Sequence, residues 1–420
     1  MRFIVGFLVC CTLMACQSTG VDAKNSVKVI KSSGVSLQRL DRIAPVMQNY
    51  IDQGKLAGTL TLVAKDGNIV YLNAQGMQDK AAAKPMSEDT LFRLYSMTKP
   101  ITAVAAMTLW EQGKFHMMDP IAKYLPEFAK MKVYVSGSGE DMVLEDAKSP
   151  IRIIDLFMHT SGLSYGFTGS EVDKMYQRLL SKPEELTRDN IIGKLAALPL
   201  VHQPGTAWNY GVSTDVIGFL VEKISGQKLG EYMQEHIFTP LGMQDTGFYV
   251  SADKLHRLSQ VYTADRKTGQ TVIMTTEPLG NFKSDPEIHN AGGGLVSSMQ
   301  DYYTFAQMLL NGGEINGVRI LGRKTVEYLT GNHLPESLVP YSKDSPGNGF
   351  ALAMSVTVDP QMSAFMSSKG SYGWGGMAST FFRVDPEENM VMISMAQFVP
   401  IGFHRYHEDF INLVYQALVD

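Results

Sequence analysis

The sequence has little cysteine, no strongly charged segment and no long apolar run. Its three cysteines, Cys10, Cys11 and Cys16, all lie near the N-terminus of the 420-residue chain, so the remainder cannot form a disulfide. The net charge of −5 and the lack of a basic cluster argue against nucleic acid as a partner. No glycine-rich phosphate loop or dinucleotide-binding motif is present. We therefore expect no organic cofactor and no metal ion.

The first residues predict export and lipid attachment. After a positive start at Arg2, residues 3–15 form an apolar run that is too short to span a bilayer as a helix. The run ends in LMAC, from Leu13 to Cys16, which resembles the bacterial lipobox. This resemblance implies a signal peptide over residues 1–15, cleavage before Cys16 and acylation of that cysteine. The alternative is an ordinary signal peptide with a cysteine by chance.

Residues 16–36 are polar and lack apolar periodicity, which is typical of a flexible tether. A tethered, acylated chain would lie on a membrane through its lipid and would not span it. We therefore expect the protein in the bacterial cell envelope, lipid-anchored on the periplasmic side of the outer membrane. The sequence does not indicate an oligomeric state.

The part of the chain after the tether, residues 37–418, is long enough for one large domain or two intertwined layers. Apolar periodicity predicts a helix over 37–53, then a hairpin of strands over 59–65 and 69–73 joined by Asp66-Gly67. From about residue 100 to 310 the pattern is mostly helical. Later segments predict strands and a final helix, over 350–358, 378–384, 390–396 and 404–418.

These elements predict an α/β (α+β) fold. We expect its two outer parts, about 37–95 and 345–418, to form one antiparallel sheet flanked by helices. The stretch of about 100–310 would then be an inserted, mostly helical domain. A site between the sheet and this insert would lie in a cleft, where ligands commonly bind.

The segment Ser96-Met97-Thr98-Lys99 places a hydroxyl and an amine three residues apart at the start of a helix. Side chains at i and i+3 share a helix face, so Ser96 Oγ and Lys99 Nζ can approach hydrogen-bond distance. The helix N-terminus adds unpaired N–H groups and a positive dipole, which favour a neutral Lys99 able to accept the serine proton. The alternative is a serine at a helix start and an exposed lysine one turn later.

A second candidate is Tyr210, in a loop rich in turn residues, PGTAWNYGVS at 204–213, that leads into a helix. Its phenol would relay a proton between the serine and a leaving group if it lies near the amine. The alternative is a buried tyrosine whose hydroxyl is satisfied within the core.

A third candidate is the run from Gly373 to Met377, GWGGM, which we expect to enter a strand at Ala378. Its glycines, Gly375 and Gly376 among them, would let a substrate approach the backbone closely. The N–H of Met377 would then pair with the N–H of Ser96 to hold an oxyanion. The alternative is a glycine-rich bend.

In this order and across residues 37–418, the three motifs resemble the class C β-lactamase superfamily of serine β-lactamase and penicillin-binding-protein-like folds. The signature of that family is Ser-x-x-Lys, Tyr-x-Asn and a Lys/His/Trp-x-Gly strand, and the strongest likeness is to family VIII carboxylesterases. The resemblance implies a serine hydrolase that works through an acyl-enzyme on Ser96, with Lys99 and Tyr210 in proton transfer. Whether Lys99 or Tyr210 is the base stays open.

The chain departs from the family pattern at two positions. Val212 stands at the asparagine of Tyr-x-Asn, so one amide that orients substrate is absent. Trp374 stands where β-lactamases usually carry a lysine that attracts the carboxylate of the drug. An indole suits an apolar acyl or alcohol group, so we expect small neutral esters as substrates. The alternatives are a β-lactamase or D-alanyl carboxypeptidase, and a non-catalytic envelope protein that binds cell-wall peptides.

Other segments are expected to be structural. Residues 159–163, 240–243 and 292–295 resemble family segments and are interpreted as turns, with His159 as a hydrogen-bonding turn residue rather than a base. His404 and His407 share a helix face but have no third ligand, so we expect them on a solvated surface.

Overall fold

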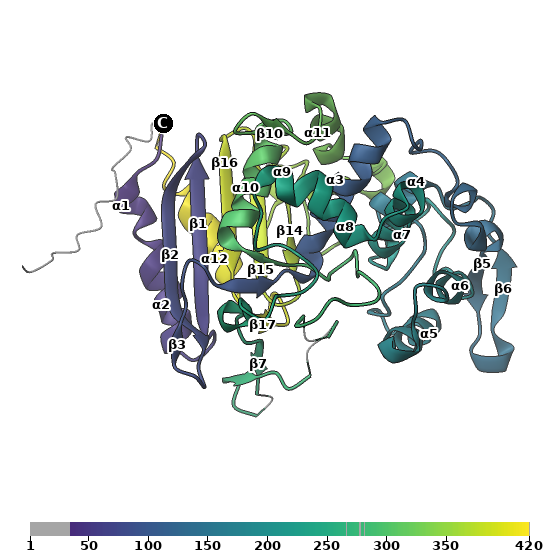
Figure 1. Cartoon of the computed structure of the whole chain (residues 1–420), viewed down its shortest axis with the longest axis horizontal. Helices are drawn as coiled ribbons and strands as arrows, with labels where there is room; N and C mark the ends of the chain where they lie inside the picture. The colour runs from purple at the N-terminus through teal and green to yellow at the C-terminus, as the bar shows by residue number, and fades with distance from the viewer. Residues whose placement is uncertain (1–33, 266, 277–278, 281, 420) are drawn as a thin grey trace, which may run out of the picture. The chain divides into compact units, whose positions relative to one another are not determined.

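The core of this computed structural model is an eight-stranded antiparallel sheet with the order β12-β13-β14-β15-β16-β1-β2-β3 (Figure 1). Its strands come from both outer parts of the chain, and β1 pairs with β16. The strands are β1 (Gly58–Lys65), β2 (Asn68–Asp79), β3 (Lys84–Pro85), β12 (Asn348–Phe350), β13 (Ser355–Thr357), β14 (Tyr372–Gly376), β15 (Thr380–Asp385) and β16 (Met390–Met395). The predicted fold class is confirmed.

The structure describes residues 34–265, 267–276, 279–280 and 282–419. The predicted signal peptide, Cys16 and the tether as far as residue 33 lie outside these residues. The last tether residues pair with the C-terminal segment, because the Ser36 N–H donates to the Ala417 carbonyl (2.8 Å) and Val35 forms a β-bridge with Leu418.

Helices cover both faces of the sheet because β1 and β16 are apolar on both sides. Alternate residues of a strand point to opposite faces. Val63 and Met392 therefore pack against α2 (Ile43–Asp52) and α12 (Tyr406–Tyr415). Ile393 packs into the larger core with α10 (Met299–Leu310) on the other face.

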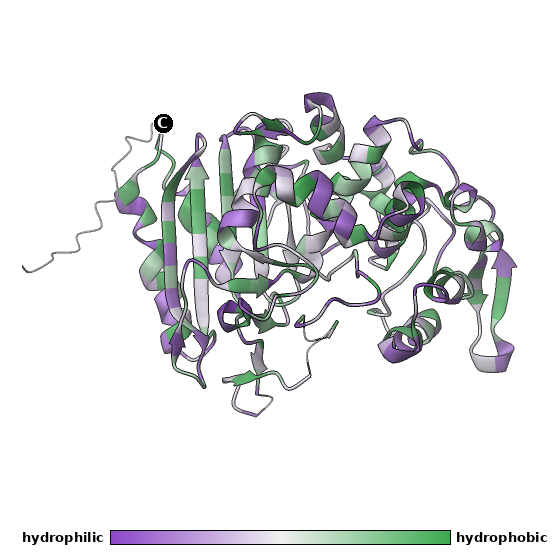
Figure 2. Cartoon of the chain, in the orientation of Figure 1, coloured by the Kyte–Doolittle hydropathy of each residue, from purple (hydrophilic) through white to green (hydrophobic). Residues whose placement is uncertain are grey.

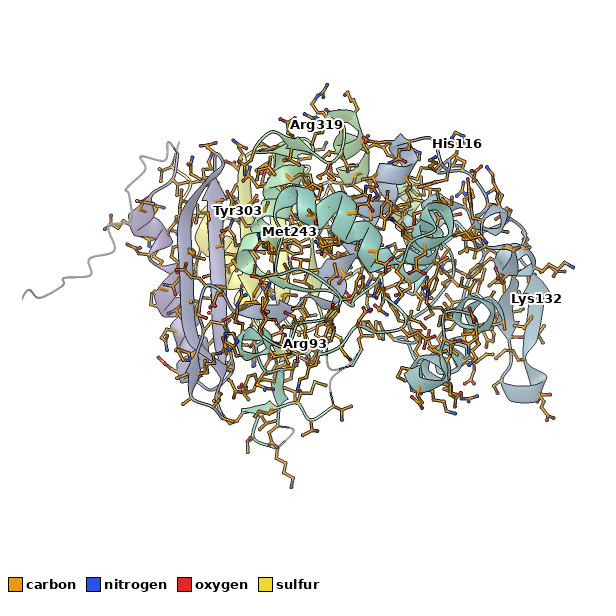
Figure 3. The ribbon with its side chains drawn as sticks, in the orientation of Figure 1. Arg93, His116, Lys132, Met243, Tyr303 and Arg319 are labelled. Carbon is orange, nitrogen blue, oxygen red and sulfur yellow. The ribbon has the colours of Figure 1, made fainter. Side chains whose placement is uncertain are left out.

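The segment between the two halves of the sheet contains helices joined by long loops. Besides α10, its helices include α3 (Thr98–Glu111), α4 (Ile153–Phe157), α5 (Glu171–Leu180), α6 (Ile191–Ala196), α7 (Ser213–Ser225), α8 (Leu229–Met233) and α11 (Arg323–Thr330). It also contains strands that periodicity did not reveal: β5 (Lys132–Ser136), β6 (Val143–Asp146), β7 (Tyr262–Ala264), β8 (Thr271–Ile273) and β9 (Val296–Ser298). Figure 3 shows Lys132, at the open end of the β5–β6 hairpin where it pairs with Asp146, remote from Tyr303 on α10.

Several predicted elements differ in their bounds. The strand expected over 69–73 is β2, which continues to Asp79, and the final helix expected over 404–418 is α12. The helix expected over 37–53 is two helices, α1 (Leu37–Leu40) and α2, separated by a turn. The strand expected over 350–358 is the hairpin β12–β13, because the chain turns at Ala353 with φ +65°. The strand expected from Ala378 begins at Thr380, and the glycine motif before it forms β14.

Hydrophilic and hydrophobic residues lie side by side on most helices (Figure 2), as expected for helices that pack on one face. Within the described residues, no helix is long and apolar enough to cross a membrane.

Candidate active site

Ser96 lies in a tight turn between the strand β4 (Leu91–Arg93) and helix α3. The turn is a short 3-10 helix, Tyr95–Met97. Tyr95 has a φ of +46°, a conformation that costs free energy for a side chain of this size and that often marks functional sites. Its ring is buried and packs edge-on against Phe282 at 5.9 Å. The surrounding core therefore holds the turn that presents Ser96.

The sheet fixes this turn from the other side. The Leu94 carbonyl accepts a hydrogen bond from Thr380 Oγ1 (3.1 Å), and the Met97 carbonyl accepts one from the Tyr302 hydroxyl (2.9 Å). A Cβ on Gly376 would lie 2.1 Å from the Leu94 carbonyl oxygen. Only glycine at this position lets β14 approach the serine turn so closely.

Lys99 is in the first turn of α3 and its side chain is buried, with 1% of it exposed. Its Nζ lies 3.2 Å from Ser96 Oγ and donates to the Gly292 carbonyl at 2.6 Å. The Ser-x-x-Lys spacing therefore joins the two groups as predicted, and the alternative of an exposed lysine is wrong.

Tyr210 lies beside both Ser96 and Lys99, with Lys99 Nζ 4.8 Å from the centre of its ring. Its hydroxyl donates to Ser96 Oγ at 2.7 Å and accepts a weaker contact from Trp374 Nε1 at 3.4 Å. His159 holds the Tyr210 loop at two points: its carbonyl accepts the Asn209 N–H (2.9 Å), and its Nδ1 accepts the Gly211 N–H (3.4 Å).

His159 is fully buried. Burial lowers its pKa, and the charge of Lys99 lowers it further. His159 is therefore neutral, and its hydrogen bonds match the structural role predicted for it. Val212, at the position of the missing asparagine, is also buried.

The glycine motif forms the wall of the site beside Ser96. In the described part of the chain, β13 pairs with β14 only at Tyr372 and Gly373, so Trp374, Gly375 and Met377 line the cleft. The peptide that carries the Met377 N–H is fixed through the Gly376 carbonyl, which accepts the Ser379 N–H at 2.9 Å.

Three residues of the site were missed from the sequence. Gly292 was interpreted as part of a turn, but its carbonyl binds Lys99. Asp215 accepts the Gly292 N–H (3.0 Å) and the Tyr165 hydroxyl (2.8 Å). Tyr165 is the third residue that was missed. The sequence could have pointed to Asp215, because an acidic residue stands within the apolar helix α7. A single sequence does not indicate that the Gly292 carbonyl contacts Lys99.

Burial raises the pKa of Asp215, and Lys99 and the Tyr165 hydrogen bond oppose that rise. Burial also raises the pKa of Tyr165, and the Asp215 charge adds to it. The network around Lys99 thus contains a buried acid, Asp215. Two hydrogen bonds, one to the carbonyl and one from the N–H of Gly292, connect Lys99 Nζ with this carboxylate.

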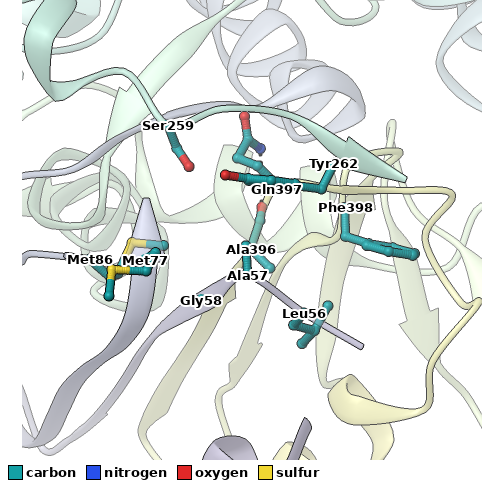
Figure 4. A pocket seen from close by; sticks show the side chains of 10 residues that line it. All are labelled: Leu56, Ala57, Gly58, Met77, Met86, Ser259, Tyr262, Ala396, Gln397 and Phe398. Carbon is teal, nitrogen blue, oxygen red and sulfur yellow. Dashed lines mark hydrogen bonds between the residues drawn. The ribbon is translucent and has the colours of Figure 1, made fainter. Parts of the chain in front are cut away.

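These residues open into a cleft of about 860 Å³. Apart from Lys99, Asp344 and Arg383, its walls are mainly aromatic and aliphatic, with Tyr165, Phe167, Leu279, Tyr341, Phe365, Trp374 and Ile401 among them. This volume is in the range of sites for small organic molecules. The pocket in Figure 4, beside Gln397 and Tyr262, is filled by its own side chains, leaves no room for a water molecule and contains none of the reactive residues.

The prediction for the two C-terminal histidines needs one correction. His407 is not on a solvated face: its ring packs between Tyr406 (3.9 Å) and Phe381 (5.2 Å) and is buried. Burial lowers its pKa to about 3. Among the described residues, no three histidine, cysteine or acidic side chains are grouped as a metal site would require.

Comparison with known proteins agrees with this geometry. The family described as β-lactamase matches residues 43–416. An uncharacterised protein of Mycobacterium tuberculosis is 36% identical over 369 residues, which are 86% of this chain and 90% of the relative. The esterase EstB of Burkholderia gladioli is 29% identical over 374 residues, 82% of this chain and 86% of EstB.

A solved structure has the same fold. EstCE1, described as a hydrolase with promiscuous acyltransferase activity, superposes with a TM-score of 0.76 at 26% identity. The match covers 90% of this chain and 99% of EstCE1.

Proposed function

This chain belongs to the β-lactamase family, a family of serine hydrolase type, and we propose that it is a carboxylesterase acting on small esters through an acyl-enzyme on Ser96. One observation carries the proposal. Ser96 Oγ lies within hydrogen-bond distance of both Lys99 Nζ (3.2 Å) and the Tyr210 hydroxyl (2.7 Å) at the floor of a largely apolar cleft. An oxygen held between an amine and a phenol is placed for nucleophilic attack.

In the acylation step, Ser96 Oγ forms a bond to the ester carbonyl carbon, and its proton passes to the Lys99–Tyr210 pair. The N–H groups of Ser96 and Met377 would hold the oxyanion. The C–O bond to the alcohol then breaks, and the pair returns the proton to the leaving alkoxide. The Gly292 carbonyl keeps Lys99 Nζ in place during both transfers.

Deacylation uses the same groups in the reverse direction. The Lys99–Tyr210 pair takes a proton from water, which attacks the acyl carbon. The bond between the acyl carbon and Ser96 Oγ breaks, and the carboxylic acid leaves. The Lys99–Tyr210 pair then returns the proton to Ser96 Oγ.

Trp374 supports esters over β-lactams as substrates. A β-lactam carries a carboxylate near its reacting carbonyl, and a cation in a dry cleft would hold it strongly. Trp374 offers one N–H, which already contacts the Tyr210 hydroxyl, and an apolar ring. The indole therefore favours an uncharged group next to the scissile bond.

We expect measurable hydrolysis of p-nitrophenyl butyrate and slow or undetectable hydrolysis of nitrocefin by the same purified protein. The measurement is kcat/KM for both compounds. Trp374→Lys should lower ester hydrolysis and raise β-lactam acylation. Ile401→Lys adds a lysine to an exposed position elsewhere in the cleft, leaves Trp374 in place and is the control. A nitrocefin value equal to or above the ester value would show that the site is built for β-lactams.

We also propose that the chain is attached to the cell envelope through a lipid on Cys16. Its basis is the LMAC sequence at residues 13–16. We expect wild-type protein to incorporate labelled palmitate and to appear in the membrane fraction. The Cys16→Ser variant should incorporate no label and should be absent from that fraction. Cys11→Ser is the matched control and should keep both. An unlabelled wild-type band at the expected mass would contradict the anchor.

A further inference from the structure

Arg383, on β15, is a buried cation in the wall of the cleft. It is 3% exposed, yet it lines the same cavity as Ser96 and Trp374. Lys99 is the other cation of the cleft and is engaged by Ser96 and Gly292. Arg383 is therefore the cleft cation that the proposed reaction leaves unused.

The partners of Arg383 are neutral. Its Nε donates to Ser371 Oγ (2.6 Å), and its Nη2 donates to Thr357 Oγ1 and to the Ser371 carbonyl (3.3 Å). The guanidinium also lies 5.2 Å from the centre of the Phe365 ring. These contacts orient the guanidinium, but they do not neutralise its charge.

Asp385 is a buried carboxylate whose charge opposes the fall in the pKa of Arg383 that burial causes, and Tyr415 is a hydrogen-bond partner of both side chains. Among the described residues, no carboxylate forms an ion pair with Arg383. Asp385 accepts the Tyr415 hydroxyl and the N–H groups of Glu387 (3.1 Å) and Glu388 (3.2 Å). Asp344, the carboxylate that lines the cleft, is exposed at the surface.

A buried guanidinium without a direct ion pair is costly. Burial lowers the pKa of Arg383, and the charge of Asp385 and the hydrogen bond with Tyr415 oppose that fall; a guanidinium stays protonated at neutral pH. Buried charges in proteins are generally paired directly. An anionic ligand in the cleft would add a direct partner through charge-assisted hydrogen bonds.

The position of Arg383 places this anion away from the reacting bond. Arg383 pairs with Gly373 across the two strands, whereas Gly376, three residues later on β14, contacts the serine turn. Three strand residues span about 10 Å. A Cβ on Gly373 would lie 2.9 Å from the Arg383 Cα, so glycine is needed where these strands meet.

We propose that the cleft takes esters that carry a carboxylate several bonds from the scissile carbonyl, bound by Arg383. This rests on the proposed esterase function and narrows its substrate class to half-esters of dicarboxylic acids and esters of carboxyl-bearing alcohols. Trp374 lies beside the uncharged part of such a substrate near Ser96. Arg383, whose side chain starts on the opposite face of β14 and β15, binds the anionic end where the cleft passes the edge of β14 beyond its pairing with β13. Neutral esters remain substrates, but they lack this second contact.

The test compares esters that differ only in the carboxylate. One pair is p-nitrophenyl hemisuberate and p-nitrophenyl octanoate, which have eight acyl carbons each. The other is 4-carboxyphenyl butyrate and phenyl butyrate, which places the charge on the alcohol. In at least one pair, kcat/KM divided by the uncatalysed rate should favour the anionic ester by about tenfold or more. No preference in either pair overturns the proposal.

Variants assign the preference to Arg383. Arg383→Met should lower the anionic-to-neutral ratio about tenfold or more, and Arg383→Lys should lower it less. Arg405→Met removes an exposed arginine and should leave the ratio within about twofold, because exposed charges are screened. An unchanged ratio in folded Arg383→Met, or an equal fall in Arg405→Met, overturns the proposal.

Binding to Ser96→Ala separates this inference from the proposed function. The Kd of each ester for that variant, measured by calorimetry, reports anion recognition without turnover and also serves if Arg383→Met does not fold. Absence of ester hydrolysis by wild-type protein would contradict the esterase function alone. Equal Kd values within both pairs would contradict the role of Arg383 alone.

Discussion

Ser96→Ala is expected to abolish ester hydrolysis and to leave the fold intact. The substitution removes one small hydroxyl from a half-buried turn. Hydrogen bonds that do not involve the Ser96 side chain hold this turn, because the Leu94 and Met97 carbonyls accept them from neighbouring side chains. Loss of a nucleophile in related chemistry costs about 10⁶ in turnover, so we expect a fall to background. The measurements are kcat/KM for p-nitrophenyl butyrate and the thermal unfolding midpoint.

A covalent probe identifies the nucleophile independently of any substrate. Wild-type protein treated with a fluorophosphonate should gain the mass of one adduct, and Ser96→Ala should gain none. Ser181→Ala is the matched control, because Ser181 is exposed and binds only the Arg178 carbonyl through its side chain. Ester hydrolysis at the wild-type rate in purified Ser96→Ala would remove the basis of the mechanism.

The short-range features of this site could be predicted from the sequence because local geometry determines them. Ser96 and Lys99 are three residues apart, so a single helical turn brings them together whatever the rest of the chain does. The helical pattern expected between residues 100 and 310 contains α7 and α10, and Gly226 ends α7 in a left-handed conformation with φ +75°.

The features that the sequence did not reveal depend on long-range pairing. The contact of Lys99 with Gly292 joins residues 193 positions apart. A sequence does not distinguish a glycine whose carbonyl binds a side chain from any other glycine. Arg383 is similar: nothing local distinguishes it from a surface arginine until β15 is paired with β14 and covered by Phe365. The glycine motif was recognised, but its strand was placed too late, because only pairing with β15 shows where β14 lies.

Lys99→Ala and Tyr210→Phe are each expected to lower kcat by at least about 10², the usual contribution of a positioned proton-transfer group. That corresponds to about 2.7 kcal/mol in the activation free energy. Tyr210→Phe is the cleaner change, because its ring keeps its stacking on Trp208 (6.0 Å) and its contact with Trp374 (5.7 Å). Lys99→Met is the companion to Lys99→Ala, since it fills the same buried space without an amine.

The control for the phenol is Tyr134→Phe, on the β5–β6 hairpin, where the hydroxyl bonds only to the Gly137 carbonyl (3.0 Å) through its side chain. It should retain wild-type turnover. Either active-site variant with wild-type kcat would show that its side chain does not transfer the proton.

The double variant Lys99→Met/Tyr210→Phe shows whether the two side chains act as a unit. Both contact the same oxygen, Ser96 Oγ, and Lys99 Nζ lies 4.8 Å from the centre of the Tyr210 ring, so removing one should leave the other without a complete path for the proton. We therefore expect the double variant to lose little more than the worse single variant, because groups that work as a unit are strongly non-additive. Independent contributions would multiply to about 10⁴. A fully multiplicative loss in kcat, measured under single-turnover conditions, would assign separate steps to the lysine and the tyrosine and contradict a shared proton transfer.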